Sequence, residues 1–439
     1  MIIDRKLIGR EEFTYKEFKA EWFEKAKTDG FLIFDGLKFD EGAIFDREVS
    51  DIKSIEFHNC IFVRSKIEGL KNFDEIFFHN SNQIVSLTIN EFQGKKLTFE
   101  KSKEDKSDSY QINRLNIKNS TIDQVQLRMT CRDLEIETVA TKFLLIDYVE
   151  NLVCDVLKSI NGKSEMLVTK SNTITLLSVI DYNVQIAGYK GISLIISLSQ
   201  LTKLQLTKAE FETVSIVDTT VIHSLDWKEI KIENLKLWKS SLNSKRNYLS
   251  EFEIKNASMD IETSLPLDLN NEDETEKIKG FSRLKMIAKS NGKFSLVDHY
   301  EKERLIANYR IRKVEVKQMG FSEQFDFLFT HTLPYHTSRF NYEFWRPVFV
   351  FLILVHPFWT GVLIFSLNRD IPLAEWPISF INDYIGLYFH TVFPFHDIQY
   401  SESIKVPLPI SFFMRIYSSY FIYQIVTASR KLINRAEEL

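Results

Sequence analysis

Pairs of apolar residues separated by one residue recur at steps of nine to eleven residues, sometimes doubled, between positions 50 and 260. Two apolar side chains at i and i+2 lie on one face of a strand. A short strand, a polar turn and another strand at a fixed spacing are typical of coils that stack on one another. The pattern therefore predicts a parallel β-solenoid over residues 31–265, with two strands and about twenty residues in each coil. The pairs are Ile55/Phe57, Ile76/Phe78, Leu87/Ile89, Leu97/Phe99, Leu115/Ile117, Val125/Leu127, Leu134/Ile136, Leu144/Ile146, Ile174/Leu176, Val184/Ile186, Leu194/Ile196, Leu204/Leu206, Val214/Ile216, Leu225/Trp227 and Leu235/Leu237.

Two other repetitive folds fit this pattern less well. A β-sandwich also has short strands every eight to twelve residues, but its hairpins favour Asn-Gly or Asp-Gly turns. Between residues 50 and 260 the chain contains one such turn, Asn161-Gly162. A leucine-rich repeat requires Asn or Cys at a fixed offset after each apolar pair, and none recurs here. The regular spacing favours the solenoid.

The segments on either side of the solenoid have a different pattern. Residues 1–30 are rich in aromatic residues, lack an apolar signal-peptide core, and are expected to form a helix that caps the first coil. A polar run at 101–109 is expected to form a solvated loop. Residues 266–338 are interpreted as an acidic linker, at 268–280, followed by a helical connector. Its helices are expected at 281–290 and from 294 to about 318.

One face of the second connector helix is basic. Lys302, Arg310, Lys313 and Lys317 fall within about a quarter of the helix circumference. The overall composition gives no such bias, because the formal net charge is −4 and the pI is near 6.2. The favoured interpretation is a solvated face near a membrane. The alternative, more specific interpretation is a stripe that binds a polyanion, such as an oligonucleotide or an anionic lipid head group.

Residues 339–439 are expected to form a two-span, pore-like transmembrane domain. Val348–Leu367 carries no formal charge anywhere along its length, and that length matches the hydrocarbon thickness of a bilayer. Pro357, after His356 at its centre, is expected to kink the helix and to free a carbonyl group. Leu408–Ser429 is the second expected span, and its one charge, Arg415, is expected to snorkel or to face a lumen.

The segment between the two spans is aromatic and amphipathic. Residues 376–395 are too polar for a third span and are expected to form an interfacial or re-entrant helix. Basic residues flank the outer ends of the spans, so the positive-inside rule places both termini in the cytoplasm. Two helices cannot enclose water, so a pore requires a homo-oligomeric ring, for example a tetramer. The candidate pore and membrane residues are His356, Pro357, Asp383, His390, Phe393, Pro394, His396 and Arg415.

The region from Phe281 onward resembles bacterial membrane proteins that join a pentapeptide-repeat or β-helical domain to a small ion-channel-like domain. The matching pieces are Arg283-Leu284-Lys285, Tyr300-Glu301, Ser338, Arg346-Pro347, Phe393-Pro394-Phe395, Tyr423-Gln424 and Ala428-Ser429-Arg430-Lys431. The overall plan also resembles the membrane effector of Hailong-type antiphage defence. This resemblance implies an inner-membrane channel held closed by an oligonucleotide that a partner nucleotidyltransferase makes. The solenoid lacks the five-residue period of pentapeptide repeats, and no potassium-filter sequence is present.

Known catalytic and metal-binding motifs are absent from the sequence. Cys60, Cys131 and Cys154 stand alone and are expected to be buried thiols, and neither a metal site nor a cofactor is predicted. The leading hypothesis is an oligomeric, ligand-gated membrane effector that permeabilises the membrane and is not an enzyme. One alternative is a membrane-anchored solenoid scaffold for partner proteins. The least favoured is a carbohydrate-active β-helix enzyme, because the carboxylates are scattered.

Overall fold

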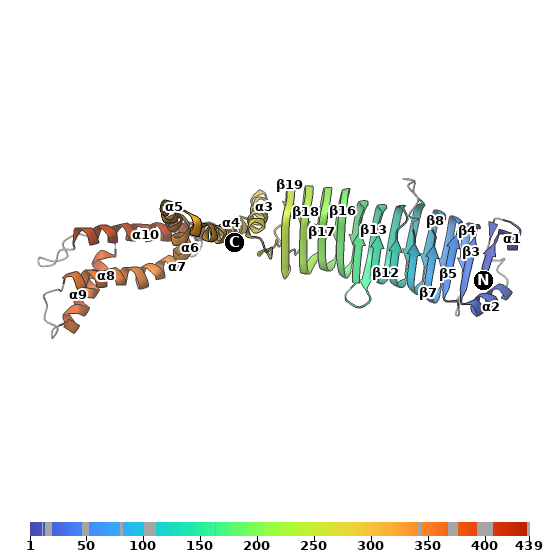
Figure 1. Cartoon of the computed structure of the whole chain (residues 1–439), viewed down its shortest axis with the longest axis horizontal. Coiled ribbons are helices and arrows are strands. Elements are labelled where there is room, and N and C mark those ends of the chain that lie inside the picture. The colour runs from blue at the N-terminus through green and yellow to red at the C-terminus, as the bar shows by residue number, and fades with distance from the viewer. Residues whose placement is uncertain are drawn as a thin grey trace. The chain divides into compact units, whose positions relative to one another are not determined.

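Parallel strands stacked on one another build the first part of the chain in the computed structural model, which describes residues 1–10, 12–13, 20–45, 52–79, 82–100, 111–162, 164–340, 344–367, 376–392 and 407–436. The chain divides into a solenoid unit, residues 1–292, and a helical unit, residues 293–439. The strands are β1 (Ile2–Asp4), β2 (Glu12–Phe13), β3 (Phe31–Asp35), β4 (Lys38–Phe45), β5 (Ser54–His58), β6 (Ile61–Glu68), β7 (Lys71–Phe78), β8 (Gln83–Asn90), β9 (Gln93–Phe99), β10 (Ile112–Lys118), β11 (Thr121–Leu127), β12 (Cys131–Ile146), β13 (Val149–Ser159), β14 (Ser164–Val168), β15 (Ser171–Leu177), β16 (Ile180–Ser197), β17 (Gln200–Val217), β18 (Thr220–Trp238) and β19 (Arg246–Met259) (Figure 1).

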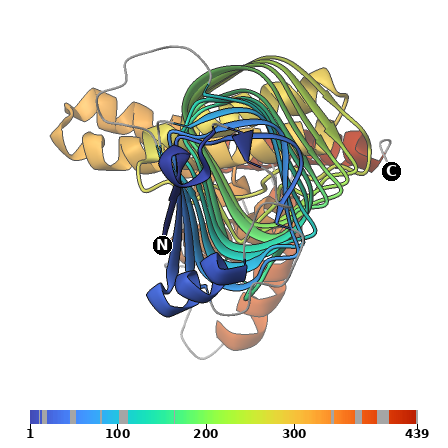
Figure 2. The ribbon, with the colours of Figure 1, turned by 90° about the vertical axis from the view of Figure 1, so that its right-hand side faces the viewer.

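The predicted parallel β-solenoid is confirmed, with about ten turns. Each strand pairs in parallel with the strand one coil later, and Figure 2, seen along the stack, shows the coils superimposed. The coils differ in length, since Leu134 pairs with Leu152 in the next coil, whereas Leu97 pairs with the more distant Val125 across the insertion. The expected loop at 101–109, within that insertion, lies outside the described residues.

The inward faces of the coils carry the apolar pairs that define the repeat. Every member of these pairs is at most 3% exposed. In the first coils one column is a ladder of stacked rings, with centroids 5.2 Å apart for Phe34–Phe57, 4.8 Å for Phe57–Phe78 and 4.4 Å for Phe78–Phe99. Burial of each ring contributes about 1.5–3 kcal/mol, and each aromatic pair contributes about 0.5–1.5 kcal/mol more.

One corner of the coil places a residue in the left-handed conformation in turn after turn. These residues are Gly69, Glu91, Asn119, Thr138, Val156, Ser178, Leu198, Asp218 and Lys239, nearly all of which have a Cβ that disfavours this conformation. The stacking offsets the strain, because the backbone N–H of Leu198 donates to Val217 in the next coil at 3.0 Å. Beside this corner runs a buried hydroxyl ladder. There the Thr219 N–H donates to Ser240 Oγ at 3.3 Å, and this hydroxyl donates to the Trp238 carbonyl at 2.8 Å.

The first coil begins earlier than residue 31. Helix α2 (Ala20–Asp29) lies within the expected cap and buries Trp22 and Ala26, while a short helix α1 (Arg5–Ile8) follows β1. The same segment also supplies strands, because β1 pairs in parallel with β3 and β2 pairs with β4. The N-terminal segment is therefore part of the sheet as well as a helical cover.

Asparagine side chains cover the open edge of β19. Asn271 donates to the Leu249 carbonyl at 3.0 Å and accepts from the Leu249 N–H at 3.1 Å. Asn291 accepts from the Met259 N–H at 2.8 Å and donates to the Ala257 carbonyl at 3.1 Å. A primary amide offers the same donor and acceptor as a peptide group, so these side chains replace the missing next strand. The exposed edge that would otherwise pair with another chain is blocked.

Helix α3 (Glu274–Ser290) packs against β19 and completes this end of the solenoid. Its Phe281, Leu284 and Ile287 are buried. At Gly280 a Cβ atom would lie 2.5 Å from Leu269 Cδ1 and 3.3 Å from the Leu249 carbonyl oxygen, so a larger residue here would displace the leucine side chain. Residues 266–292 therefore belong to the solenoid unit, whereas the sequence suggested a separate linker and connector. The predicted break at Asn291-Gly292 is where this unit ends.

The second unit is helical. Its elements are α4 (Phe294–Glu315), η2 (Val316–Gln318), α5 (Phe321–Phe327), η3 (Leu328–Thr332), α6 (Leu333–Ser338), α7 (Trp345–Phe349), η4 (Val350–Val355), α8 (His356–Leu367), α9 (Trp376–Thr391) and α10 (Leu408–Ala436). Among the described residues, Trp345–Ile364 alone is long and apolar enough to cross a membrane, with a mean hydropathy of 2.1. The expected second span, Leu408–Ser429, lies within α10. The polar side chains of α10, including Arg415, lower its mean hydropathy, so it does not count among the helices apolar enough to cross.

Replacing Asn291 with alanine is predicted to open the edge of β19. The change leaves the Met259 N–H and the Ala257 carbonyl without this partner, at a cost of about 1–3 kcal/mol in local stability. Hydrogen exchange of peptides covering 253–260 should become faster. The control is Asn256→Ala, because the Asn256 side chain on the same strand is exposed and bonds to Asn234 at 3.1 Å. Equal exchange in the two variants would contradict the capping role.

Candidate functional site

His356 lies at the junction of α8, α9 and α10 and is fully buried. Its Nε2 is 2.7 Å from the Tyr388 carbonyl oxygen, and its Nδ1 is 2.9 Å from Tyr417 Oη. A carbonyl oxygen only accepts, so this network assigns the proton to Nε2 and makes Nδ1 the acceptor of the tyrosine hydroxyl. The structure therefore places this candidate pore residue at the centre of the helical packing.

The segment before Pro357 is a π-helix, η4, that joins α7 to α8. In the π-helical register the His356 N–H bonds to Phe351, so Leu352 would pair with the N–H that Pro357 lacks. Tyr388 Oη donates to this freed Leu352 carbonyl at 2.9 Å, and Tyr384 Oη donates to the Pro357 carbonyl at 3.0 Å. Two tyrosines of α9 thus satisfy the carbonyl groups around the proline.

The helical unit buries polar side chains and exposes large apolar ones. Buried polar residues are Thr337, His356, Thr360, Thr391, Ser411, Ser418 and Gln424. Exposed apolar residues are Trp345, Phe349, Ile353, Leu354, Phe358, Ile385, Phe389, Leu408, Phe412, Phe413, Ile416 and Val426. A smaller apolar cluster of Leu363, Ile364, Leu387 and Met414 holds α8, α9 and α10 together. Large apolar side chains exposed in this number are unusual on the surface of a water-soluble protein.

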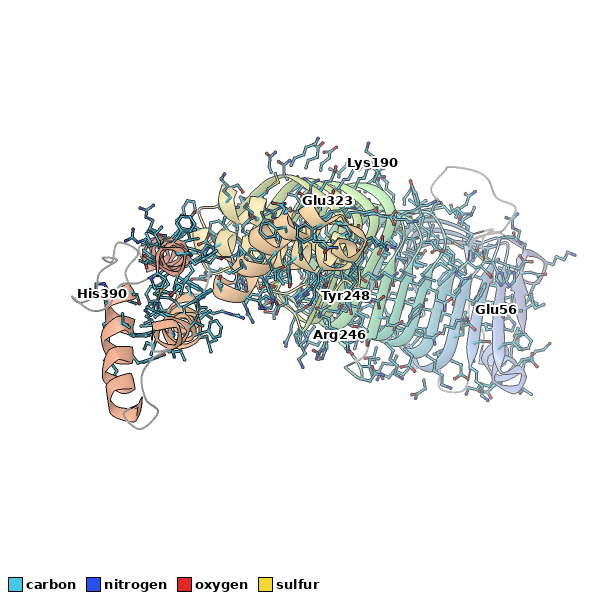
Figure 3. The ribbon with its side chains drawn as sticks, turned by 60° about the vertical axis from the view of Figure 1, so that its left-hand side comes forward. Glu56, Lys190, Arg246, Tyr248, Glu323 and His390 are labelled. Atoms are coloured by element: carbon cyan, nitrogen blue, oxygen red, sulfur yellow. The ribbon has the colours of Figure 1, made fainter. Side chains whose placement is uncertain are left out.

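The structure describes only some of the remaining candidate membrane residues. His390 is half-buried on α9, where Figure 3 labels it, and Arg415 is half-buried on α10, two residues before Tyr417. Asp383 lies on α9, but its side chain is not described. Phe393, Pro394 and His396 lie outside the described residues. Their predicted roles in a pore therefore stay predictions.

The basic stripe spans two helical elements. Lys302, Arg310 and Lys313 lie on α4, whereas Lys317 lies on η2, because the α-helix ends at Glu315. Lys313 Nζ is 6.0 Å from the centre of the Tyr309 ring. That ring is buried and stacks on Tyr335 at 4.3 Å. Arg310, Lys313 and Lys317 are exposed and Lys302 is half-buried, so an anion has access to the stripe.

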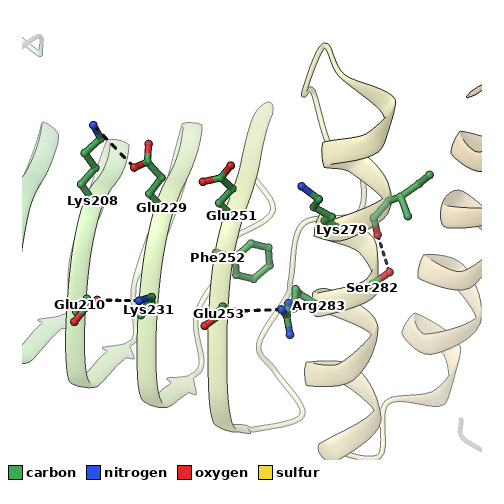
Figure 4. A pocket seen from close by; sticks show the side chains of 11 residues that line it. Lys208, Glu210, Glu229, Lys231, Glu251, Phe252, Glu253, Lys279, Ser282 and Arg283 are labelled. Carbon is green, nitrogen blue, oxygen red and sulfur yellow. Dashed lines mark hydrogen bonds and ion pairs between the residues drawn. The ribbon is translucent and has the colours of Figure 1, made fainter.

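A groove of about 800 Å³ follows the last coils and α3 within the solenoid unit (Figure 4). Its charged side chains are Lys208, Glu210, Glu229, Lys231, Glu251, Glu253, Lys279 and Arg283, four acids and four bases. The ion pair Lys231–Glu210, at 3.1 Å, links successive coils, and the ion pair Arg283–Glu253, at 3.7 Å, links α3 to β19. The groove is thus a balanced ladder of surface ion pairs, each contributing at most about 1 kcal/mol.

Two histidines and a glutamate meet on the outer face of the first coils. His58 Nε2 is 3.1 Å from Glu56 Oε2, and His79 Nε2 is 3.3 Å from the same oxygen. The imidazole rings stack with their centroids 3.6 Å apart. Burial alone would raise the pKa of Glu56, but hydrogen bonds from the two histidines, with their charges, outweigh it and lower that pKa. Figure 3 labels Glu56 among these coils.

The sequence interpretation missed this cluster. His58 and His79 stand one coil apart, in the same register in which Ser54 pairs with Glu75, and this separation matches no metal-binding motif. A search for polar side chains repeated at the coil period would have found them. Cys60 nearby is not part of the cluster, because it is buried and donates inward to the Phe34 carbonyl at 3.5 Å. Burial raises the pKa of its thiol to about 12, as expected for a structural cysteine.

Comparison of the chain with protein-family models, with curated proteins and with solved structures gives no significant match.

The basic stripe is predicted to bind a polyanion. Changing Lys302, Arg310, Lys313 and Lys317 together to Gln should weaken binding of a single-stranded oligonucleotide. It should also flatten the dependence of log K on log salt by about 0.7 for each phosphate that the variant no longer neutralises. Fluorescence anisotropy over a salt series measures both. A matched control removes the same charge from exposed lysines of the solenoid unit, Lys228, Lys236, Lys239 and Lys245. If both variants bind like the wild type, the stripe is a solvated face.

Proposed function

We propose that this chain is an integral membrane protein, with the solenoid unit in solution and the helical unit in the bilayer. The observation that carries the proposal is the large exposed apolar surface of the helical unit, which surrounds buried polar side chains. His356 and Thr360 are fully buried, while Ile353 and Phe358, on the same continuous stretch of helix, are 60% and 64% exposed. Exposed side chains of this size are stable against lipid and unstable in water.

The proposal includes α10 as a second span. Its mean hydropathy is below that of Trp345–Ile364, yet its exposed face carries Phe412, Phe413 and Ile416. The polar groups that reduce its hydropathy turn away from that face, since Ser411, Ser418 and Gln424 are buried. Arg415 is half-buried and lies near the start of the helix, where its long side chain can reach an interface. A mean hydropathy combines the two faces of a helix, so it does not show that one face is apolar and the other polar.

We further propose that several copies assemble into a ring that conducts ions, in an effector of the kind that Hailong-type defence uses. Side chains fill the junction of α8, α9 and α10 in one chain, so a water path needs more than one subunit. The lipid bilayer would be one partner and further copies of the chain the others. The exposed stripe on α4 and η2 supports an anionic ligand such as an oligonucleotide, which a partner nucleotidyltransferase would make.

A second candidate is a membrane-anchored scaffold. The solenoid presents long columns of charged side chains, such as Glu210–Lys231–Glu253 in register on β17, β18 and β19, which provide an extended docking surface. The size of the detergent-extracted particle separates the two functions, because a scaffold needs no ring whereas a pore does.

The chain is predicted to remain in the membrane pellet after alkaline carbonate extraction. Replacing both Ile353 and Leu354 with Asp should release it, because an acid near the centre of a span costs about 2.5–3.5 kcal/mol. The control is Ile261→Asp, which changes an apolar residue of the solenoid unit that is 91% exposed. Immunoblots of pellet and supernatant measure the distribution. A wild-type chain found in the supernatant would refute the membrane assignment.

The purified protein, reconstituted in liposomes, is predicted to release trapped ions or dye in at least one ligand condition. The conditions are protein alone and protein with single-stranded oligonucleotide. A flux assay with empty liposomes and the Ile261→Asp variant as controls measures the release, and light scattering in detergent measures subunit number. Tight vesicles in both conditions, with a monomer in detergent, would favour the scaffold.

A further inference from the structure

We propose that Glu56, His58 and His79 form a binding site for a divalent transition-metal ion such as Zn²⁺. The ligand set is two imidazole nitrogens and one carboxylate oxygen. These are the donors that zinc and neighbouring metals take in proteins, and this combination leaves coordination positions open. The inference is independent of the membrane function proposed above, because it concerns only the first coils of the solenoid unit.

The distances fit a metal ion. Zn–N and Zn–O bonds of about 2.0–2.1 Å in a tetrahedron place neighbouring ligand atoms about 3.3 Å apart. The two nitrogen–oxygen distances are 3.1 and 3.3 Å, and all three ligand atoms lie within 4.8 Å of one another. The two rings lie 29° from parallel, and both Nε2 atoms face the same oxygen of Glu56.

The fold fixes the ligands before an ion arrives. Glu56 and His58 lie two residues apart on β5 and therefore on the same outer face of the strand. His79 follows β7 directly, and the Phe57–Phe78 register stacks it on His58. The Phe77 ring, 4.3 Å from the His79 ring, covers one side. A site on paired strands loses little conformational entropy when the metal binds.

The burial of the cluster also suits an ion site. The side chains of Glu56, His58 and His79 are 36%, 31% and 30% exposed. An ion can therefore reach them from solvent, while the partly dehydrated carboxylate strengthens the electrostatic attraction. The fourth position is open to water or to a ligand atom from another molecule.

The test is Co²⁺ and Zn²⁺ binding by the full-length chain in detergent after removal of metals by a chelator. The wild type should bind Co²⁺ with visible d–d absorption that Zn²⁺ abolishes, and Zn²⁺ should raise its melting temperature. His79→Gln and Glu56→Gln should each lower the affinity at least about tenfold, given that loss of outer-shell partners alone costs 10–100-fold. The control is His223→Gln, since His223 is an exposed histidine on β18.

The result that overturns the proposal is Co²⁺ binding that is absent from the wild type or unchanged in His79→Gln and Glu56→Gln. Circular dichroism establishes that each variant is folded. If His79→Gln fails to fold, Glu56→Gln decides, because glutamine keeps the shape of the side chain and a hydrogen-bond acceptor while removing the charge. Loss of binding in His223→Gln would also overturn it, since the metal would then be held elsewhere.

Discussion

The parallel pairing of each coil with the next is the interaction on which the structure depends. Backbone hydrogen bonds fix the separation of the coils, and this separation stacks equivalent side chains in columns. Inside the coil the columns are apolar, as in the ladder of Phe34, Phe57, Phe78 and Phe99. At the corner, a left-handed residue such as Leu198 or Asp218 is retained in coil after coil because its N–H finds a carbonyl in the next one.

The same pairing creates a problem at the last coil, where a strand has no further partner. Side-chain amides take the place of the missing strand, since Asn271 and Asn291 each supply a donor and an acceptor to the backbone of β19. Helix α3 then covers the apolar interior with Phe281, Leu284 and Ile287. A stack of repeats has no closed core of its own, so these end pieces keep it soluble and prevent growth by edge pairing.

The helical unit exposes large apolar side chains around a mixed interior. Its apolar cluster at Leu363 and Met414 is inside together with His356 and Thr360, whereas Phe358 and Phe412 are outside. Removing the N–H at Pro357 would be costly in lipid, yet Tyr388 donates to the carbonyl that this leaves at Leu352. The buried hydrogen bonds and the exposed apolar surface are the basis on which we propose that this unit lies in a membrane. In the solenoid unit, the stacking of one coil on the next brings His58 and His79 together.

The sequence by itself determined the inward-facing residues and the main helices, because both follow from local periodicity. The apolar pairs from Ile55/Phe57 to Leu235/Leu237 are all buried, and the break at Asn291-Gly292 separates α3 from α4. Only the tertiary structure decided the edge amides of β19, the Glu56–His58–His79 cluster and the polar junction around His356. Each joins residues from different coils or helices. The repeat gives only an approximate coil length, and the length varies from coil to coil, so the exact register and the pairing of the helices come from the tertiary structure.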